Sequence, residues 1–513
     1  MEYSFSWVVW SSTIFFLVAL ILLPRGKESK HAKRKPPGPP GLPIVGNIFD
    51  LGTIPHQTLY NLIPKYGPIL RLKLGSVNTL AIQSAKAATE FFKNHDHIFC
   101  DRKCPIALTA HNYNQGSLAI GQYGVYWRIL RRICSMELLV NKRINETTHV
   151  RRKCIDNMIQ FIEDDVAAAQ ARGELGEVNL VHYLFVMAFN IVGNLTLSRD
   201  LLNSHSKEGE EFFAAMSKVM VWAGAPNLAD FLPFLQRLDP QGIKKGMDRD
   251  MGRAMKIIAG LVKERTIEKN KMTKEKRMKD FLDAVLEYER DGGKEGPDRI
   301  SNQNVIIIIL EMFFAGSETT SSSLEWAMTE LLRNPESMRK IKEELDQVVG
   351  RNRKVEETDT SELPYLKAVV KETLRLHPPI PLLLPRNSMQ QTEFNGYHIP
   401  KDTQIFVNAW AIGRDPECWA DPLCFKPERF LGSNIDYKGQ NFELIPFGSG
   451  RRICVGMSLA DRVLHLTIAS LVQSFEWELG SNISPETIDM SERMGLSVRK
   501  LTPLKVIPKK RVI

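Results

Sequence analysis

The chain has 513 residues, of which 43% are hydrophobic, and a formal net charge of +9 at pH 7. This length and apolar content are enough to bury a large core, arranged as one large domain or as two or three ordinary ones. Its seven cysteines are an odd number and too sparse for a disulfide scaffold, which excludes a small disulfide-held protein and indicates a reducing compartment.

The N-terminus predicts a membrane anchor. Residues 5–23 are uncharged and apolar, long enough to span a bilayer, and six cations follow between residues 25 and 35 with only Glu28 opposing them. By the positive-inside rule the rest of the chain lies in the cytosol, so the sequons at Asn145 and Asn194 stay unglycosylated. A cleaved signal peptide lacks support, because no basic segment precedes the apolar run and no small-residue cleavage site follows it. Anionic headgroups explain the basic flank better than nucleic acid does, since no base-reading motif accompanies it.

Residues 36–43 are rich in proline and glycine and predict a semi-rigid extended spacer. We therefore expect an anchor over 1–24, a basic flank and proline-rich hinge over 25–43, and one folded domain over 44–513. Runs of alternating polarity at 69–74 and 79–82 predict strands, whereas the longest segments have helical periodicity. The expected fold class is mainly α with a small β subdomain.

Residues 304–333 predict a helix of roughly 45 Å at 1.5 Å rise per residue. Its middle, residues 315–323, reads Ala-Gly-Ser-Glu-Thr-Thr-Ser-Ser-Ser, and hydroxyls in such a run compete for carbonyls four residues back. Thr319 should therefore bond to the Ala315 carbonyl, with a local kink or opened turn. A capped helix end is the alternative, but the helical pattern resumes at 324–328.

Residues 447–456 place one thiol on a glycine-punctuated loop, beside two guanidinium groups and a phenyl ring. Glycines allow the backbone to approach a flat porphyrin and direct N–H groups at sulfur, and arginines supply cations for propionates. The alternative reading is that Cys454 is a small buried hydrophobe. Phe447, Gly450, Arg452, Cys454 and Gly456 follow the spacing F-x-x-G-x-R-x-C-x-G, and here the chain resembles the cytochrome P450 family.

The resemblance implies a P450 fold after the single transmembrane helix, and a haem b cofactor. Cys454 would be the axial iron ligand, with Phe447, Arg452 and Gly456 in the cofactor-binding loop. The run Ala315 to Thr319 resembles the family's oxygen-binding groove, A-G-x-[DE]-T. The implied catalytic residues are Thr319, whose hydroxyl hydrogen-bonds the oxygen molecule, and Glu318, which helps relay protons to it.

Other motifs match the family in order along the chain. Trp127 and Arg131 lie at i and i+4 of a helix and are implied propionate partners, as is Arg386 after the proline-rich segment. An ordinary stacked surface pair is the alternative for Trp127 and Arg131. Glu372 and Arg375 form an i, i+3 pair, which is usually a surface salt bridge. The resemblance instead joins them to Arg429 in a buried structural triad.

His377, directly after that helix and before two prolines, is interpreted as a helix-ending residue and not as a metal ligand. Three apolar segments are expected at the substrate pocket and indicate a small lipophilic substrate: 306–314, 380–384 and 494–496. Tyr113, Asn114 and Ser117 are candidate polar contacts for an alcohol or carbonyl. The alternative is a loop hydrogen-bonded to itself.

Within the family, the motifs look like those of a plant microsomal enzyme of the geraniol-hydroxylase-like group, which oxidises monoterpenoids, iridoids and related terpenoids. An alkaloid, a phenolic compound or a fatty acid is the alternative substrate. No GxGxxG or flavin-binding segment is present in the sequence, so a separate NADPH-cytochrome P450 reductase of the endoplasmic reticulum membrane is the implied electron donor. The candidate docking cations, with a merely solvated surface as the alternative, are Arg128, Arg132, Lys142 and Arg143.

Three classes of function follow. The leading one is a monooxygenase that uses O2 to oxidise a terpenoid. The second is a haem-thiolate isomerase or dehydratase that needs neither O2 nor reductase, and the third is a non-catalytic haem-binding or lipid-binding membrane protein. The presence of both Glu318 and Thr319 favours the first.

Overall fold

The computed structural model describes residues 34–511, apart from 203–206, 272–279, 290–295, 298 and 481–482. The predicted membrane anchor over 1–24 and the basic flank up to residue 33 lie outside the described residues. Everything below concerns the described part of the chain.

Helices dominate this part, as the sequence predicted. The α-helices are α2 (Pro55–Asn61), α3 (Ile63–Tyr66), α4 (Ala85–Asn94), α5 (Tyr113–Gly116), α6 (Val125–Ile133), α7 (Asn141–Glu146), α8 (Thr148–Ala171), α9 (Leu180–Leu197), α10 (Lys207–Gly224), α11 (Leu228–Phe231), α12 (Ile243–Lys271), α13 (Phe281–Leu286), α14 (Asn302–Arg333), α15 (Pro335–Val348), α16 (Pro364–Leu376), α17 (Ala409–Ile412) and α18 (Met457–Ser474). Shorter helical turns are η1 (Phe49–Leu51), η2 (Ile106–Asn112), η3 (Cys134–Leu138), η4 (Pro233–Leu235), η5 (Glu357–Glu362), η6 (Pro427–Phe430), η7 (Gly450–Arg452) and η8 (Pro485–Thr487).

The strands form small, separate sheets. A four-stranded sheet has the order β1 (Ile69–Leu74), β2 (Val77–Ile82), β7 (Gln404–Val407), β4 (Arg386–Asn387), with β2 and β7 parallel. A three-stranded antiparallel sheet joins β3 (Val178–Asn179), β11 (Lys505–Lys510) and β8 (Phe475–Leu479), and two hairpins pair β5 (Thr392–Phe394) with β6 (Tyr397–Ile399) and β9 (Glu492–Met494) with β10 (Val498–Lys500). The predicted strand at 69–74 is present, and the one at 79–82 begins two residues earlier, at Val77.

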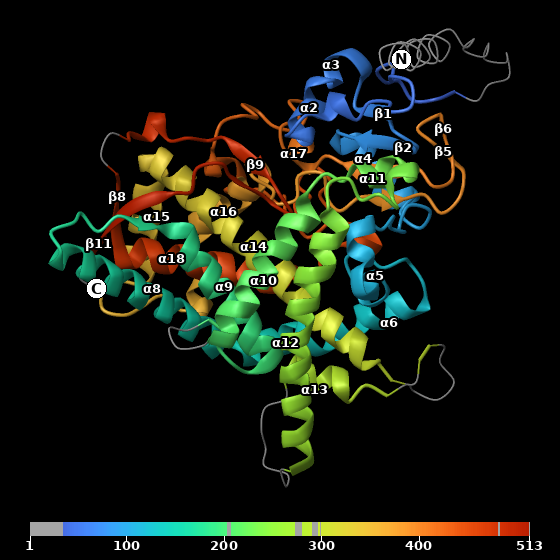
Figure 1. The fold of residues 1–513 in the computed structure, drawn as a ribbon. Helices are drawn as coiled ribbons and strands as arrows, with labels where there is room; N and C mark the ends of the chain where they lie inside the picture. Colours follow the sequence, from blue (N-terminus) through green and yellow to red (C-terminus); the bar gives the residue numbers. More distant parts are fainter. Residues whose placement is uncertain are drawn as a thin grey trace, which may run out of the picture.

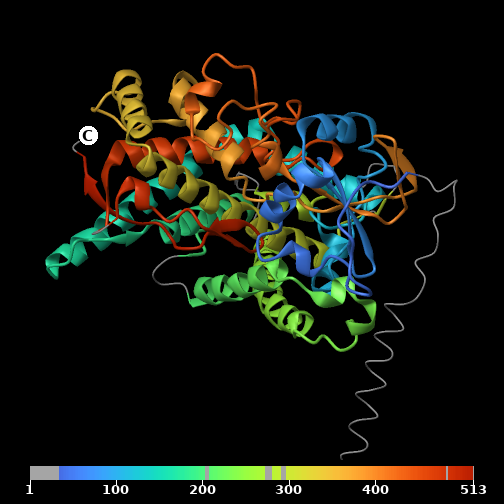
Figure 2. The same cartoon turned by 90° about the horizontal axis from the view of Figure 1, so that it is seen from above.

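The two larger sheets lie at opposite ends of a helical body, and the β9–β10 hairpin lies between them against α14 (Figure 1). Figure 1 shows β1, β2, β5 and β6 gathered with α2 and α4 on one side, and β8 and β11 on the opposite side. The view from above repeats this division (Figure 2), with α14 passing between the two ends. The fold is thus mainly α with minor β regions.

Helix α14 is the centre of the core. It packs along α9 and also contacts α12, α16 and α18. Both α9 and α14 are long and apolar enough to cross a membrane, but 72% of the most apolar window of each is buried inside the protein, as expected for core helices. The expected opened turn is not present in α14, because the backbone stays helical from Asn302 to Arg333; the expected kink stays a prediction. The hydroxyls bond to carbonyls without breaking the helix.

The proline-rich segment is bound to the folded domain. The Arg71 amide of β1 donates to the Pro37 carbonyl at 2.7 Å, and the His398 amide of β6 donates to the Arg34 carbonyl at 2.8 Å. A Cβ on Gly38 would lie 1.9 Å from the Arg71 carbonyl oxygen, so this close approach requires glycine. Residues 34–38 therefore pack on the small β region.

Candidate active site

The loop before α18 holds Cys454 in a constrained turn. Gly448 and Gly450 have φ values of 70° and 68°, and a Cβ on Gly450 would lie 2.3 Å from Asp96 Oδ1. The Cys454 amide donates to the Phe447 carbonyl at 2.9 Å. Positive φ and close packing together explain why glycines stand at these places in the loop.

The Cys454 thiol lies three residues before Met457, the first residue of α18. Burial raises the pKa of this thiol, while the N–H groups of Gly456 and Met457 and the nearby Arg131 guanidinium oppose that rise. The side chain is nevertheless accessible, so the sulfur borders an opening within the protein. A thiolate here, with backbone donors behind it and open space before it, suits an axial ligand of haem iron.

A second accessible face lies in the middle of α14. Ala315 is exposed and Gly316, Thr319 and Thr320 are partly exposed, although the helix is otherwise buried on both sides of this turn. These positions are spaced i, i+1, i+4 and i+5, so they share one face of the helix. Since α14 and α18 pack against each other, both helices contribute accessible residues within one core. A planar cofactor between them fits this arrangement.

The predicted bond of Thr319 is present. Its Oγ1 donates to the Ala315 carbonyl at 2.6 Å, so the hydroxyl lies at the accessible turn and its oxygen retains lone pairs for another donor. Glu318, next to it, is buried. Its Oε1 accepts from Ser497 Oγ at 3.0 Å and lies 2.9 Å from Arg499 Nε as an ion pair. The other oxygen, Oε2, has no hydrogen-bond partner among the described residues.

Guanidinium groups gather beside the Cys454 loop. Arg386 bonds to Asp96 Oδ1 at 2.5 Å and to the Ser449 carbonyl at 2.7 Å, and Arg131 bonds to the Ile453 carbonyl at 2.6 Å. Arg452 bonds to the carbonyls of Cys100 and Gly121 at 2.8 and 2.7 Å. The structure thus brings all three predicted propionate arginines to the loop.

A fourth arginine, Arg102, was not predicted. It is buried, and it donates to the carbonyls of Ala119 at 3.0 Å and Pro385 at 2.9 Å, as well as to Leu384. The sequence carried no motif that would single it out. Its role in the cluster follows only from the fold.

These four arginines form a positive cluster inside the protein. Burial lowers the pKa of each of them, to about 10 for Arg452. Asp96 and Asp101 are the carboxylates that oppose this, and Asp96 also pairs with the exposed Arg451 at 3.0 Å, so five guanidinium groups face two carboxylates. The two propionates of haem b would offset most of this excess positive charge. The residues present therefore fit the cofactor.

Trp127 lies within the same cluster. Its indole Nε1 donates to the Leu118 carbonyl at 2.8 Å, and the Arg452 guanidinium lies 4.0 Å from the centre of its ring system. Phe447, by contrast, packs against Tyr437, with ring centroids 5.3 Å apart. The indole thus supports the loop that carries Leu118, while Arg452 stacks on it.

The loop that carries Leu118 is also held by a buried carboxylate, Glu311, which was not predicted from the sequence. Glu311 of α14 accepts from Tyr113 Oη at 3.1 Å, from Ser117 Oγ, and from the amides of Leu118 and Ala119 at 2.5 and 3.1 Å. The hydroxyls of Tyr113 and Ser117, expected as substrate contacts, are therefore directed to Glu311. A single acid within the apolar run 305–314 was the available signal.

Glu372, Arg375 and Arg429 are brought together. Arg375 makes a two-bond pair with Glu372 at 2.7 Å for both contacts, and Arg429 Nε lies 3.0 Å from Glu372 Oε1. Both members of the Glu372–Arg375 pair are fully buried. Arg375 also donates to the carbonyls of Gly413, Pro422 and Cys424. The cluster ties α16 to the chain preceding the Cys454 loop.

His377 follows the last residue of α16, as predicted. Its Nε2 lies 2.7 Å from Glu330 Oε1, and its ring stacks on Trp326 with centroids 4.1 Å apart. The His377 imidazole is thus held by the Glu330 carboxylate and by stacking on the Trp326 ring.

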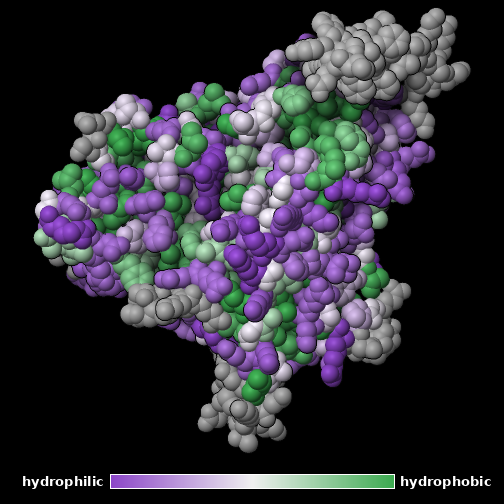
Figure 3. All heavy atoms as spheres, in the orientation of Figure 1, coloured by the Kyte–Doolittle hydropathy of each residue, from purple (hydrophilic) through white to green (hydrophobic). Residues whose placement is uncertain are grey.

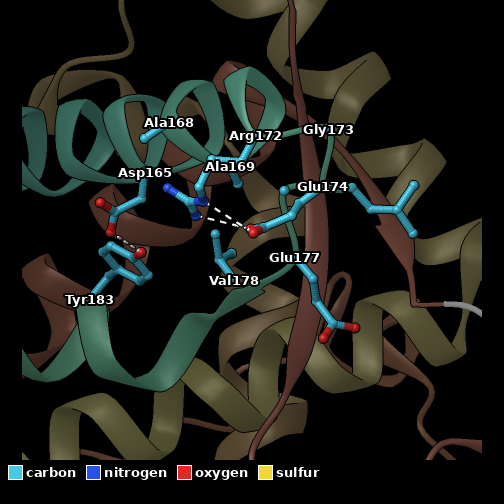
Figure 4. Close-up of a pocket in the computed structure, with 11 residues that line it drawn as sticks. Asp165, Ala168, Ala169, Arg172, Gly173, Glu174, Glu177, Val178 and Tyr183 are labelled. Carbon is cyan, nitrogen blue, oxygen red and sulfur yellow. Dashed lines mark hydrogen bonds and ion pairs between the residues drawn. The ribbon is translucent and has the colours of Figure 1, made fainter.

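A pocket of about 590 Å³ lies elsewhere, between the end of α8 and the start of α9 (Figure 4). Within it Tyr183 donates to Asp165 at 2.5 Å and Arg172 donates to Glu174 at 2.9 and 3.0 Å. The polar side chains that line this pocket are thus paired with each other, Tyr183 with Asp165 and Arg172 with Glu174. We assign this pocket no role in the reaction.

Comparison with known proteins shows which family this chain belongs to. A family model described as Cytochrome P450 matches residues 36–506. The chain is 61% identical to an iridoid oxidase of Catharanthus roseus over 97% of this chain and 96% of that protein, and 41% identical to a geraniol 8-hydroxylase of the same plant over 94% and 95%. A solved structure, zebra fish cytochrome P450 with progesterone, superposes with a TM-score of 0.73 at 26% identity, covering 89% of this chain and 99% of that one. The chain therefore belongs to the cytochrome P450 family, and it is an oxidoreductase that uses haem b.

Proposed function

We propose that this protein is a membrane-attached monooxygenase that oxidises a small lipophilic terpenoid, with iridoids and other monoterpenoids as the substrate class. The observation that carries the reaction type is the accessible turn of α14, with Thr319 and Glu318, in the same core as the Cys454 loop. The substrate class is supported by the 61% identity to an iridoid oxidase along nearly the whole chain.

The bound haem supplies the activation of O2 by two electrons, after which one oxygen atom enters the substrate and the other leaves as water. The chain's own residues then have three tasks. Cys454 holds the cofactor through its sulfur, the arginine cluster holds its carboxylates, and Thr319 with Glu318 delivers the protons that form water. Because Glu318 is buried and Thr319 is accessible at the turn, these two side chains span from the protein interior to the open space.

Apolar segments support a lipophilic substrate. Residues 307–314 of α14 are buried. In the predicted pocket segment 380–384, Pro381 and Leu382 are buried and the other three residues are partly exposed, as are residues 494–496. Gly224, at the end of α10, packs so closely on Gly495 and Leu496 that an added Cβ would lie 2.3 Å from the Leu496 amide. A substrate bound at these segments would be enclosed mainly by hydrocarbon.

Electron delivery by NADPH-cytochrome P450 reductase remains part of the proposal. The candidate docking cations lie on α6 and α7, where Arg128, Arg132 and Lys142 are exposed and Arg143 pairs with Glu146 at 3.1 Å. The same α6 carries Arg131, which reaches the Cys454 loop. A reductase bound at these cations would be close to the cofactor-binding loop in the fold.

Attachment to the endoplasmic reticulum by residues 1–24 is likewise proposed, with residues 44–513 as the catalytic domain in the cytosol. Exposed apolar side chains near the N-terminal end of the described chain support it: Leu42, Ile44, Phe49, Phe234 and Leu238. The β1–β2 turn contacts the segment just before Phe234 and Leu238, because the Ser76 amide donates to the Phe231 carbonyl at 2.8 Å. Figure 3 shows apolar atoms over the region of α2 and α11. Such a patch suits a lipid surface beside an anchor.

The direct test is turnover by the full-length protein in microsomes, with and without the reductase. A panel of iridoids, acyclic monoterpenoids, fatty acids and phenolics would be screened first for substrate-induced shifts of the haem Soret band, and binders then followed by mass spectrometry under ¹⁸O2. We expect a product that carries one ¹⁸O atom, formed only with reductase and NADPH, from an iridoid or monoterpenoid. Turnover without O2 and reductase would establish an isomerase or dehydratase instead.

A further inference from the structure

Glu318 is held by two side chains of the turn and strand that follow β9. Ser497 Oγ donates to Glu318 Oε1 at 3.0 Å, and Arg499 Nε of β10 lies 2.9 Å from the same oxygen. Oε2 is buried and has no hydrogen-bond partner among the described residues. Arg499 Nε likewise makes no hydrogen bond among the described residues, so Oε1 is held by one hydrogen bond and one ion pair. Oε2 is the oxygen that remains without a partner.

The backbone that carries Arg499 is itself fixed. The Val498 carbonyl accepts from Ser322 Oγ at 2.7 Å, and the Val498 amide donates to the Pro379 carbonyl at 2.8 Å. Ser322 lies four residues after Glu318, so both residues are on the same face of α14. The strand is thus bound to α14 at two successive turns, which sets the point from which Arg499 reaches Glu318.

Arg499 connects a buried group to solvent. Its side chain is 25% exposed, whereas that of Glu318 is 6% exposed. A guanidinium does not release its proton at physiological pH, so Arg499 cannot carry protons itself. It can hold the Glu318 carboxylate at the border between the partly exposed guanidinium and the interior.

We infer that Arg499, supported by Ser497, is a positioning residue that holds Glu318 for proton delivery to Thr319. This rests on the proposed function. Forming one water from O2 takes two electrons and two protons in each turnover. Each proton would be taken up from solvent at Glu318 Oε2 and passed to the Thr319 hydroxyl, which gives up its own proton toward the open space and regains one from Glu318. The electrons come from NADPH through the reductase. When proton delivery through Glu318 and Thr319 is impaired, O2 takes up the same two electrons and two protons and is released as hydrogen peroxide, and no product forms.

The test compares Arg499→Gln, Arg499→Lys and Ser497→Ala with the natural chain, in full-length protein reconstituted with reductase. The matched control is Arg493→Gln, because Arg493 is exposed and lies directly across the hairpin from Arg499. The readouts are product formed per NADPH consumed, hydrogen peroxide released, and the solvent deuterium isotope effect. The carbon monoxide spectrum and the substrate-induced Soret shift report cofactor and substrate binding separately.

We expect Arg499→Gln to keep both spectra, to lower coupling several-fold, and to raise the solvent isotope effect. That loss should be smaller than the roughly 100-fold or greater loss of rate expected when the relay itself is removed in Thr319→Ala or Glu318→Ala. Arg499→Lys should restore part of the coupling, Ser497→Ala should lower it mildly, and Arg493→Gln should leave it unchanged.

Unchanged coupling in Arg499→Gln and Ser497→Ala, alongside uncoupling in Glu318→Ala, would overturn the role of Arg499 and leave the proposed function standing. Unchanged coupling in Glu318→Ala and Thr319→Ala as well would overturn the proton relay. If Arg499→Gln does not bind haem, Arg499→Lys and Ser497→Ala decide, since both retain most of the local packing; normal coupling in both would overturn the inference.

Discussion

At the scale of single residues, the sulfur of Cys454 decides whether the cofactor has a thiolate ligand. Cys454→Ser should abolish the long-wavelength absorption band of the reduced carbon monoxide complex, because an alkoxide does not replace a thiolate at neutral pH. The control is Cys418→Ser, since Cys418 is also an exposed free cysteine but is not part of the loop 447–456. A band that survives in Cys454→Ser and disappears in Cys418→Ser would contradict the assigned ligand.

Glu311 provides a second test at this scale. Glu311→Gln replaces one acceptor oxygen with a donor facing O–H and N–H groups, which should cost about 1–3 kcal/mol of stability. The loop it holds also supplies the carbonyls of Ala119 to Arg102 and Gly121 to Arg452. We therefore expect faster haem loss as well as a lower melting temperature.

The measurement is haem transfer to an apo-globin acceptor, followed by thermal unfolding. Tyr113→Phe removes one of the donors and should have a smaller effect. Glu289→Gln, which disrupts an exposed pair with Arg299, should change neither quantity. Equal haem retention in Glu311→Gln and Glu289→Gln would show that the loop does not depend on Glu311.

Residue-scale prediction from sequence succeeded where a motif spans a few neighbouring positions. The Thr319 back-bond and the i, i+3 pair of Glu372 and Arg375 are both local patterns, and both contacts are present. Arg102 and Glu311 were missed because their partners are distant in the chain: Glu311 and Ser117 are 194 residues apart. Burial and hydrogen bonding of this kind are set by the tertiary fold, which periodicity does not specify.

At the scale of elements, the Glu372 cluster is the clearest joint between helix and loop. Removing one partner of a buried ion pair leaves a charge without compensation, typically at a cost of 3–5 kcal/mol. Glu372→Gln should therefore abolish accumulation of haem-loaded protein or lower its unfolding midpoint strongly. Arg339→Gln, in an exposed pair with Glu336, should leave the midpoint unchanged. The measurement is urea unfolding followed by the carbon monoxide band, and equal midpoints in the two variants would contradict a structural triad.

Element boundaries show the same division between local and tertiary causes. Helix α14 was predicted as 304–333 and runs from Asn302, with Ser301 as its N-cap through a bond to the Asn304 amide. The two-residue strands β3 and β4 were not predicted, because each exists only through pairing with a distant strand. No turn of α14 opens at the Ser/Thr-rich run, because hydroxyl-to-carbonyl bonds can be added to an intact helical ladder.

At the scale of the whole molecule, the small β region, the docked proline-rich segment and the apolar patch all lie where the described chain begins. Because residues 34–38 are bound to β1 and β6, an anchor that precedes them would hold this side of the domain close to the bilayer. With the proposed anchor, the positive-inside rule would place the domain in the cytosol. The backbone hydrogen bonds of residues 34–38 to β1 and β6 would therefore set how an anchored domain is oriented on the membrane.

This topology gives the last prediction. Protease added to intact microsomes should digest the catalytic domain, whereas a lumenal marker protein stays protected until detergent is added. Asn145 is exposed, so it would be glycosylated if the domain faced the lumen. A glycan at Asn145 would therefore indicate the lumenal orientation. Treatment with a glycosidase, and the variant Asn145→Gln, should therefore leave electrophoretic mobility unchanged. A protected domain, or a mobility shift abolished by Asn145→Gln, would contradict the cytosolic orientation and with it access to the reductase, since the exposed cations of α6 and α7 would then face the wrong compartment.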